Sequence, residues 1–168
     1  MKQFLAVLSM VMLGVSAQSQ AHEGVIHVKK SVSINATADA VWTKVANFGD
    51  LGAWHPAVAK TVIVEGKDNE VGAKRELTLQ DGGKINETLT AYNAKKKTMS
   101  YIITSGVLPV SDYQSVITVK AAGKNKSVVT WVGNFKPAKD QTMKTAEDAI
   151  SGVYDGGLAN LKKITEAK

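Results

Sequence analysis

Apolar and polar residues alternate through most of the chain, in runs separated by short connectors that contain Gly, Asp, Asn or Lys. Such alternation, with many β-branched residues, is typical of strands that bury one face. It predicts seven strands, at residues 25–34, 60–65, 72–80, 84–93, 97–105, 112–121 and 127–136. Because most connectors are short enough for hairpins, we expect an antiparallel sheet.

Two stretches instead repeat apolar residues at the helical period. Thr37 is a suitable N-cap for a helix whose apolar stripe runs over 38–48, and Gly49 and Pro56 break this region into two short pieces. The long helix predicted at the C-terminus has an apolar face made of Met143, Ala146, Ile150, Val153, Tyr154, Leu158, Leu161 and Ile164. This face must be buried, so we predict an α+β fold. A curved seven-stranded sheet wraps around the C-terminal helix, and two short helices lie between strands one and two.

The turn at Asp81-Gly82-Gly83 fixes which side chains of its two strands point inward. A three-residue loop keeps the apolar residues of both strands on one face, whereas a two-residue loop does not. The three-residue loop pairs Leu77 with Glu87 and Arg75 with Leu89. Arg75 and Glu87 then both point inward as diagonal neighbours, about 7–8 Å apart at the backbone.

The same reasoning at the next glycine turn, Gly123-Lys124-Asn125, pairs Ile117 with Trp131 and Tyr113 with Phe135. Four aromatic side chains therefore share the inward face: Tyr101, Tyr113, Trp131 and Phe135. They either line a ligand cavity between sheet and helix or simply pack the core.

Two polar features are candidates for chemistry. Arg75 is the only arginine of the chain, and an inward arginine needs a partner, for which Glu87 is the obvious choice. The two either anchor an anionic ligand or form a structural ion pair at the cavity floor, and we favour the structural pair. Trp54 and His55 end the short helices near the expected cavity mouth. His55 could act as a base near neutral pH, but the chain offers it no nucleophile or orienting group, which favours a structural role.

The amino-acid composition limits which kinds of domain, site and partner remain possible. The 168 residues carry a formal charge of +6, are 44% apolar and include no Cys. One domain is expected, and disulfides, thiolate metal sites and a cysteine nucleophile are excluded. We expect no metal site and no cofactor. Nucleic-acid binding is disfavoured, because the positive charge is carried by Lys rather than by the Arg side chains that read bases.

The N-terminal segment has the features of a targeting signal. Lys2 precedes an apolar run at 4–15 and a small-residue sequence that ends at Ala21. This order is typical of a secretory signal peptide, and the run is short for a membrane span. We expect cleavage after Ala21, which leaves a mature domain at 22–168 without stable membrane insertion. An exported chain without Cys suits a bacterial periplasm. An earlier cut after Ala17 and an uncleaved anchor are the alternatives.

Short motifs spread over nearly the whole mature chain carry a resemblance to a known family. They lie at 28–34, 36–42, 54–56, 71–75, 81–83, 87–89, 108–113 and 135–137. The chain resembles the START-like helix-grip (SRPBCC) superfamily, which includes polyketide cyclase/dehydrase and lipid-transport proteins. Its middle motifs are similar to the MxaD-type branch.

The resemblance implies a single helix-grip domain over 22–168. It also implies an exported accessory protein of periplasmic methanol oxidation that assists electron transfer from a quinoprotein alcohol dehydrogenase to its cytochrome. The alternative is a cavity-based binder of a small hydrophobic molecule or lipid, or a cyclase- or hydrolase-like enzyme. Because no nucleophile and base occur together, the non-enzymatic role is favoured.

Overall fold

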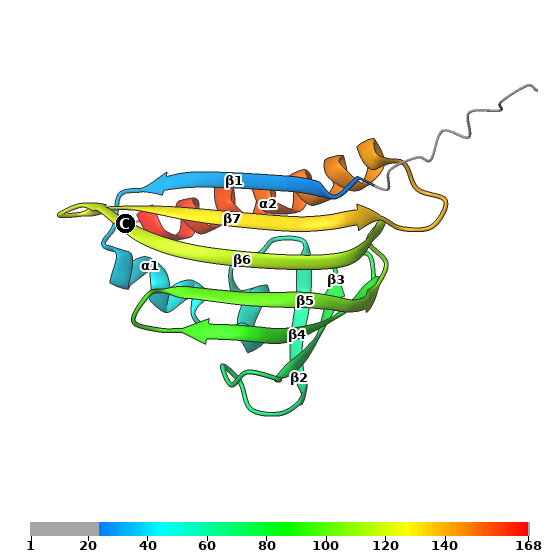
Figure 1. Cartoon of the computed structure of the whole chain (residues 1–168). Helices are drawn as coiled ribbons and strands as arrows, with labels where there is room; N and C mark the ends of the chain where they lie inside the picture. The colour runs from blue at the N-terminus through cyan, green and yellow to red at the C-terminus, as the bar shows by residue number, and fades with distance from the viewer. Residues whose placement is uncertain (1–23, 168) are drawn as a thin grey trace, which may run out of the picture.

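The protein is represented by a computed structural model that describes residues 24–167. The expected signal peptide, residues 1–21, lies outside these residues, and its cleavage stays a prediction. Seven strands form one antiparallel sheet in the order β1-β7-β6-β5-β4-β3-β2 (Figure 1). The elements are β1 (Ile26–Ile34), α1 (Ala38–Val45), η1 (Phe48–Ala53), β2 (Val58–Glu65), β3 (Lys74–Leu79), β4 (Lys84–Asn93), β5 (Thr98–Gly106), β6 (Val110–Gly123), β7 (Lys126–Pro137) and α2 (Met143–Glu166).

The sheet wraps around α2, which confirms the predicted α+β helix-grip fold. Figure 1 shows α2 running along β1 and β7, while β2 and β3 curl around the other side of the core. The helix buries one face, made of Ala146, Ile150, Tyr154, Gly157, Leu158 and Leu161. Met143 is wrong as a member of this face. It is the first residue after the Thr142 cap and is 50% exposed, so burial begins one turn later.

The short helices form where the sequence predicts them. The Thr37 side chain accepts a hydrogen bond from the Ala40 N–H at 3.2 Å, which caps α1 as expected. The second piece, η1, is a 3-10 helix with a kink at Asp50. Phe48 belongs to η1 rather than α1, and both Phe48 and Leu51 are buried. α1 contacts β6, β7 and α2, and η1 contacts β2 and β3.

The predicted register between β3 and β4 is wrong by two residues. Arg75 pairs directly with Glu87, and Leu77 pairs with Ile85. Because side chains alternate with a period of two, an even shift keeps every side chain on its predicted face. Arg75 and Glu87 are therefore directly opposite each other instead of diagonal.

The shift has its cause in the turn, which uses Gln80, Asp81 and Gly82 as its three loop residues. The Leu79 N–H donates to the Gly83 carbonyl at 2.8 Å, so Gly83 already belongs to the ladder. Gly82 takes the left-handed conformation, with φ of 87°, which a residue without Cβ adopts at low cost. The loop length was predicted correctly, and its position along the chain was not.

The predicted register of β6 and β7 holds over most of the hairpin. Ile117 pairs with Trp131, as expected. Tyr113 and Phe135 do not pair, because the register shifts between Ser111 and Gln114. Their rings still stack, with centroids 5.9 Å apart and planes at 28°.

The core lies between the concave face of the sheet and α2. Besides hydrophobic and aromatic residues, five polar or charged residues among residues 24–167 are buried, namely His55, Arg75, Glu87, Ser115 and Ser127. None of the helices within residues 24–167 has the length and hydropathy needed to cross a membrane.

Candidate functional site

The eight predicted site residues all lie inside the fold, each no more than 5% exposed: Trp54, His55, Arg75, Glu87, Tyr101, Tyr113, Trp131 and Phe135. They do not form one site. Five of them line a cavity of about 70 Å³ between the sheet and α2, namely His55, Glu87, Tyr101, Tyr113 and Trp131. Trp54 and Arg75 border a smaller void beside it, of about 10 Å³. Phe135 lines neither space and packs against Tyr113.

Arg75 and Glu87 form a buried ion pair. The Arg75 Nε and Nη2 atoms both lie 2.6 Å from Glu87 Oε2. The third nitrogen, Nη1, donates to the Phe48 carbonyl, and the guanidinium lies 4.1 Å from the Phe48 ring centroid. It also lies 5.1 Å from the Tyr101 ring centroid. All three guanidinium nitrogens are thus engaged within the fold, which favours the structural reading of Arg75 over a ligand anchor.

The Glu87 carboxylate differs from Arg75, because only one of its oxygens is engaged. Both contacts from Arg75 go to Oε2, and Oε1 makes no hydrogen bond within residues 24–167. Glu87 also lines the cavity. Burial raises the pKa of Glu87, while the charge and hydrogen bond of Arg75 oppose that rise. Glu87, a residue of the cavity lining, therefore has one carboxylate oxygen without a hydrogen-bond partner among residues 24–167.

His55 lies against α2 in the interior, not at a cavity mouth. Its Nε2 lies 2.9 Å from the Val153 carbonyl, which can only accept, so Nε2 carries the proton. Its Nδ1 accepts from the Ala57 N–H at 3.2 Å. Burial lowers the pKa of His55, and the charge of Arg75 lowers it further. With both nitrogens bonded to backbone, the neutral ring has a structural role and is not placed to act as a base.

A network of hydroxyl and indole groups lies on the other side of the cavity, with Ser115 at its centre. The Trp131 Nε1–H points at both the Tyr101 hydroxyl and Ser115 Oγ, each at 2.9 Å. Ser115 Oγ lies 3.1 Å from the Tyr154 hydroxyl, which lies 2.6 Å from the Tyr113 hydroxyl. Buried polar groups with this many partners rigidify a core.

Sequence reasoning missed Ser115 and Tyr154 as members of this network. Ser115 has the same inward parity as Tyr113 and Ile117, and a lone inward Ser was the available signal. Tyr154 was assigned to the apolar face of α2, and its hydroxyl was not given a partner. Burial raises the pKa of Tyr154 to about 12 and that of Tyr113 well above its ordinary value, so both stay protonated at neutral pH.

Two glycines bring these layers into contact. A Cβ on Gly157 in α2 would lie 2.6 Å from the His55 ring and 3.0 Å from Trp131. A Cβ on Gly133 in β7 would collide with the Tyr154 hydroxyl. Hence the helix approaches the sheet as closely as it does only because both positions lack a side chain.

The cavity is small and mostly apolar. Drug-sized ligands occupy pockets of about 300–1,000 Å³, and one water takes about 30 Å³ of liquid volume. A volume of about 70 Å³ therefore accommodates a molecule of very few heavy atoms. Within the described part of the chain, no three His, Asp or Glu side chains are grouped as metal ligands would be.

Known proteins match this chain at the level of family and fold. A family model described as polyketide cyclase / dehydrase and lipid transport matches residues 25–166. A search of curated proteins found no match.

Solved structures give closer detail. The protein XoxI from Bacillus cereus is 31% identical, with 83% of this chain and 94% of that chain covered and a TM-score of 0.77. An uncharacterised protein from Bacillus thuringiensis is 30% identical, with 84% and 100% covered and a TM-score of 0.78. The Zhui aromatase/cyclase from Streptomyces is 14% identical, with 85% and 94% covered and a TM-score of 0.71, and this likeness concerns the fold.

The family match spans most of the chain, and two structures at or above 30% identity share the same architecture over more than four-fifths of it. This chain belongs to the polyketide cyclase / dehydrase and lipid transport family, within the START-like helix-grip superfamily.

Proposed function

We propose that this chain is an exported, non-enzymatic accessory protein of periplasmic methanol oxidation. In this role it assists electron transfer from a quinoprotein alcohol dehydrogenase to its cytochrome. The resemblance of its middle motifs to the MxaD-type branch supports the proposal. So does the interior, where His55 and the buried tyrosines are bonded within the fold and none is poised for acid–base chemistry near pH 7.

The observation that carries the proposal is a concentration of lysines at one end of the molecule, which we call the basic end. Four segments meet there: the C-terminal part of α2, α1, the β4–β5 turn and the β6–β7 turn, on the left of Figure 1. The Val119 N–H of β6 donates to the Lys97 carbonyl at the β4–β5 turn, and the Asn35 N–H, just before α1, donates to the Glu166 side chain at the end of α2. The lysines of the basic end are Lys44, Lys95, Lys96, Lys97, Lys120, Lys124, Lys126, Lys162 and Lys163.

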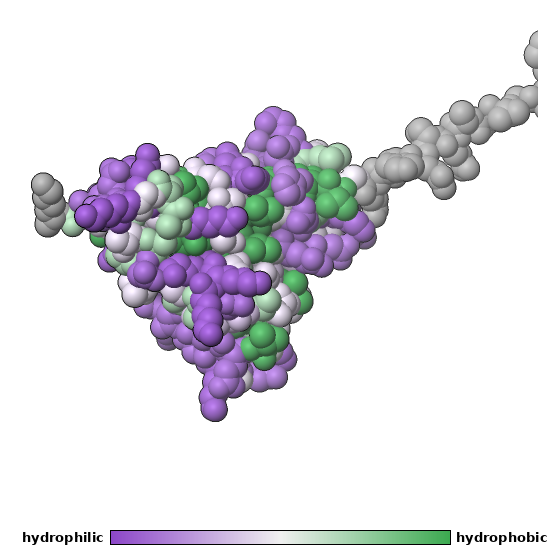
Figure 2. Space-filling view, turned by 60° about the vertical axis from the view of Figure 1, so that its left-hand side comes forward, coloured by the Kyte–Doolittle hydropathy of each residue, from purple (hydrophilic) through white to green (hydrophobic). Residues whose placement is uncertain are grey.

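Few acidic groups offset this charge. Lys97 pairs with Asp39 at 2.8 Å, and Lys162 pairs with Glu166 at 2.7 Å. The other seven lysines of the basic end make no ion pair within residues 24–167. Elsewhere most lysines are paired, as in Lys30 with Asp155. Figure 2, which turns this end forward, shows hydrophilic side chains projecting from it.

An excess of unpaired lysines at one end favours transient contact with an acidic protein surface. Clustered charge of one sign raises the rate of encounter with a partner of the opposite sign, and rim charges act mainly on association. Lysine is a flexible, well-hydrated point charge, which suits a short-lived complex. Exposed charges are screened over about 8 Å at physiological ionic strength, so the contact should weaken as salt rises.

The test is the association rate with purified quinoprotein alcohol dehydrogenase and its cytochrome, measured against salt. We expect Lys95→Glu with Lys96→Glu to slow association at low salt by about tenfold or more. The matched control reverses Lys60 and Lys139, which are exposed, make no ion pair within residues 24–167 and lie away from the basic end. Equal effects of the two double variants would refute docking through the basic end, since both change the net charge equally.

The second candidate is a cavity-based binder of a small molecule or lipid, or a cyclase- or hydrolase-like enzyme. The observation that favours a binder is that Glu87, which lines the cavity, has one carboxylate oxygen without a hydrogen-bond partner among residues 24–167. Native mass spectrometry of the protein purified from its source tests this role. A stoichiometric small molecule bound to the protein, with no redox partner recovered alongside, would promote the binder over the accessory role.

A further inference from the structure

The sheet has two outer edges, and only one of them is covered. β1 is one edge strand and β2 is the other. α2 lies along β1, where the Lys162 ammonium donates to the Ser33 carbonyl at 2.8 Å and the Asn35 N–H donates to the Glu166 side chain. Apart from its ladder with β3, the main chain of residues 59–65 in β2 makes no hydrogen bond within residues 24–167. The edge of β2 is therefore open to a further strand.

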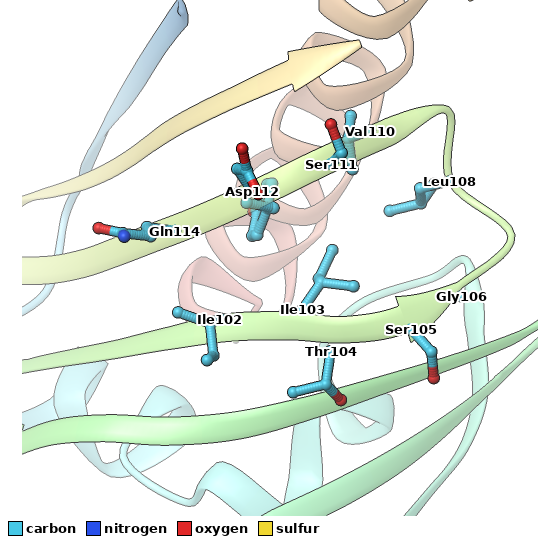
Figure 3. Close-up of a pocket in the computed structure, with 11 residues that line it drawn as sticks. Ile102, Ile103, Thr104, Ser105, Gly106, Leu108, Val110, Ser111, Asp112 and Gln114 are labelled. Carbon is cyan, nitrogen blue, oxygen red and sulfur yellow. The ribbon is translucent and has the colours of Figure 1, made fainter. Parts of the chain in front are cut away.

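The sheet also has an internal gap, between β5 and β6. The two strands pair as far as Ile102 and then separate, as Figure 3 shows. The side chains of Ile103 and Leu108 are directed into the space between them. Among the described residues, Asp112 is the only charged one that lines the gap, and its carboxylate lies 3.1 Å from Lys136 Nζ. Because that charge is already paired, no charge in the gap selects a partner, and the edge of β2 is the better docking surface.

The solvent face of β2 carries opposite charges at its two ends. Lys60, Val62 and Glu65 pair with residues of β3 on the solvent side of the sheet, and all three are exposed. Val64 has no partner on β3 and forms a β-bulge. Without this extra residue, Lys60 and Glu65 would face opposite sides of the sheet, because side chains alternate along a strand. The bulge therefore places a lysine, a valine and a glutamate in one row on the solvent face.

We propose that the edge of β2 pairs with β2 of a second copy of this chain, antiparallel and around a two-fold axis at Val62. Residues directly opposite each other in an antiparallel pair face the same side, so Val62 meets Val62 of the second copy. Beyond the bulge, Lys60 meets Glu65 of the second copy, and the symmetry forms this charge pair twice. Lys60 makes no ion pair within residues 24–167, and Glu65 is engaged by Lys74 through Oε2 alone.

The same features limit the assembly to two copies. An open strand edge risks continued growth, and lysines and bulges on the edge reduce that risk. Two-fold pairing uses the β2 edge of both copies, and the other edge, β1, is covered by α2. A shift of the pairing by two residues would separate Lys60 from Glu65 of the second copy, so the charges also fix the register. The dimer uses no residue of the basic end and does not depend on the docking role.

Sedimentation velocity against protein concentration tests the dimer. We expect a reversible monomer–dimer equilibrium, and Lys60→Glu or Glu65→Lys alone should weaken it about tenfold, because each places like charges opposite each other twice. An equimolar mixture of the two variants should restore dimers, since the opposite charges face each other again in the mixed pair. Lys139→Glu, at an exposed position outside β2, is the control for net charge.

A protein that stays monomeric at every concentration would overturn the dimer. A mixture that associates no better than either variant alone would show that positions 60 and 65 do not face each other. Because Lys60→Glu breaks the dimer, the docking variants are compared in dilute, monomeric samples, which keeps the two tests separate.

The position of the two-fold axis is tested separately, by cross-linking. Because the chain has no Cys, Val62→Cys places one thiol of each copy on the axis, opposite the same thiol of the second copy. Val116→Cys is the matched control, since Val62 and Val116 are both 38% exposed but Val116 lies on β6, away from the β2 edge. Under mild oxidation, Val62→Cys should form disulfide-linked dimers about tenfold faster or more. Equal rates in the two variants would overturn the axis at Val62.

Discussion

Removing the charge of Arg75 is the sharpest perturbation of this core. Arg75→Met keeps much of the side-chain volume but leaves Glu87 without its partner, in a position only 5% exposed. It also removes the donor to the Phe48 carbonyl and the cation over the Phe48 ring. These contacts, and the one with the Tyr101 ring, are lost together, and a buried carboxylate remains.

The expected loss is large. Breaking one partner of a buried ion pair costs about 3–5 kcal/mol, because the remaining charge stays desolvated. For a domain of this size, that loss lowers the melting temperature by about 10–15 °C. The adjacent residue supplies a control, since Lys74 pairs with Glu65 at 2.6 Å with both side chains exposed. Lys74→Met should cost no more than about 1 kcal/mol.

Urea unfolding followed by circular dichroism measures both variants. The double variant Arg75→Met with Glu87→Leu should recover much of the stability lost by Arg75→Met, because no unpaired charge is left. A loss in Arg75→Met no larger than that in Lys74→Met would refute the buried pair.

The pH dependence gives a second, independent readout. In Arg75→Met, burial raises the pKa of Glu87 without the opposing charge of Arg75. The folded state then holds the proton more tightly than the unfolded state does, so the unfolding free energy falls as pH rises above the ordinary value of 4.5. The deficit of Arg75→Met relative to the unsubstituted protein should therefore be smaller at pH 5 than at pH 7.

Other predictions concern packing, pH and export. Gly157→Ala should lower the unfolding free energy by about 1–3 kcal/mol, because the added Cβ would meet the His55 ring. Gly156→Ala has open space around the added Cβ and should raise the unfolding free energy by up to about 1 kcal/mol. Urea unfolding measures both. Because burial lowers the pKa of His55, its contribution to stability is present above pH 6.5 and is lost as pH falls below that value. Unfolding curves measured at pH 5 to 8 should show this fall in unfolding free energy, and the fall should be smaller in His55→Gln. N-terminal sequencing of the exported protein should start immediately after Ala21, and intact Met1 in the membrane fraction would contradict the signal peptide.

Alternation of side chains was enough to predict which faces are buried, but not the register. Arg75 and Glu87 were correctly placed inside the fold, because a shift by two residues preserves every face. The turn offered two adjacent glycines, Gly82 and Gly83, and either could take the left-handed position. Only the hydrogen bond between Leu79 and Gly83 decides between them, and the hydrophobic pattern does not contain it.

Hydrogen bonds from side chains to backbone carbonyls also could not be predicted from the sequence. The partner of His55 Nε2 is the carbonyl of Val153, 98 positions away, and every residue has a carbonyl. The same holds for Arg75 and the Phe48 carbonyl. The left-handed Asp112, at the register shift between β6 and β7, carries no glycine signal. A sequence predicts which side chains lie in a core better than it predicts the hydrogen-bond partner of each polar one.

The accessory role is tested most directly by the rate of electron transfer from quinoprotein alcohol dehydrogenase to its cytochrome, measured with and without this protein at low salt. We predict that the protein raises this rate, that the gain fades as salt rises, and that Lys95→Glu with Lys96→Glu removes it while reversal of Lys60 and Lys139 does not. No gain at low salt, with folded protein and both redox partners present, would contradict the accessory role and leave the cavity as the functional site.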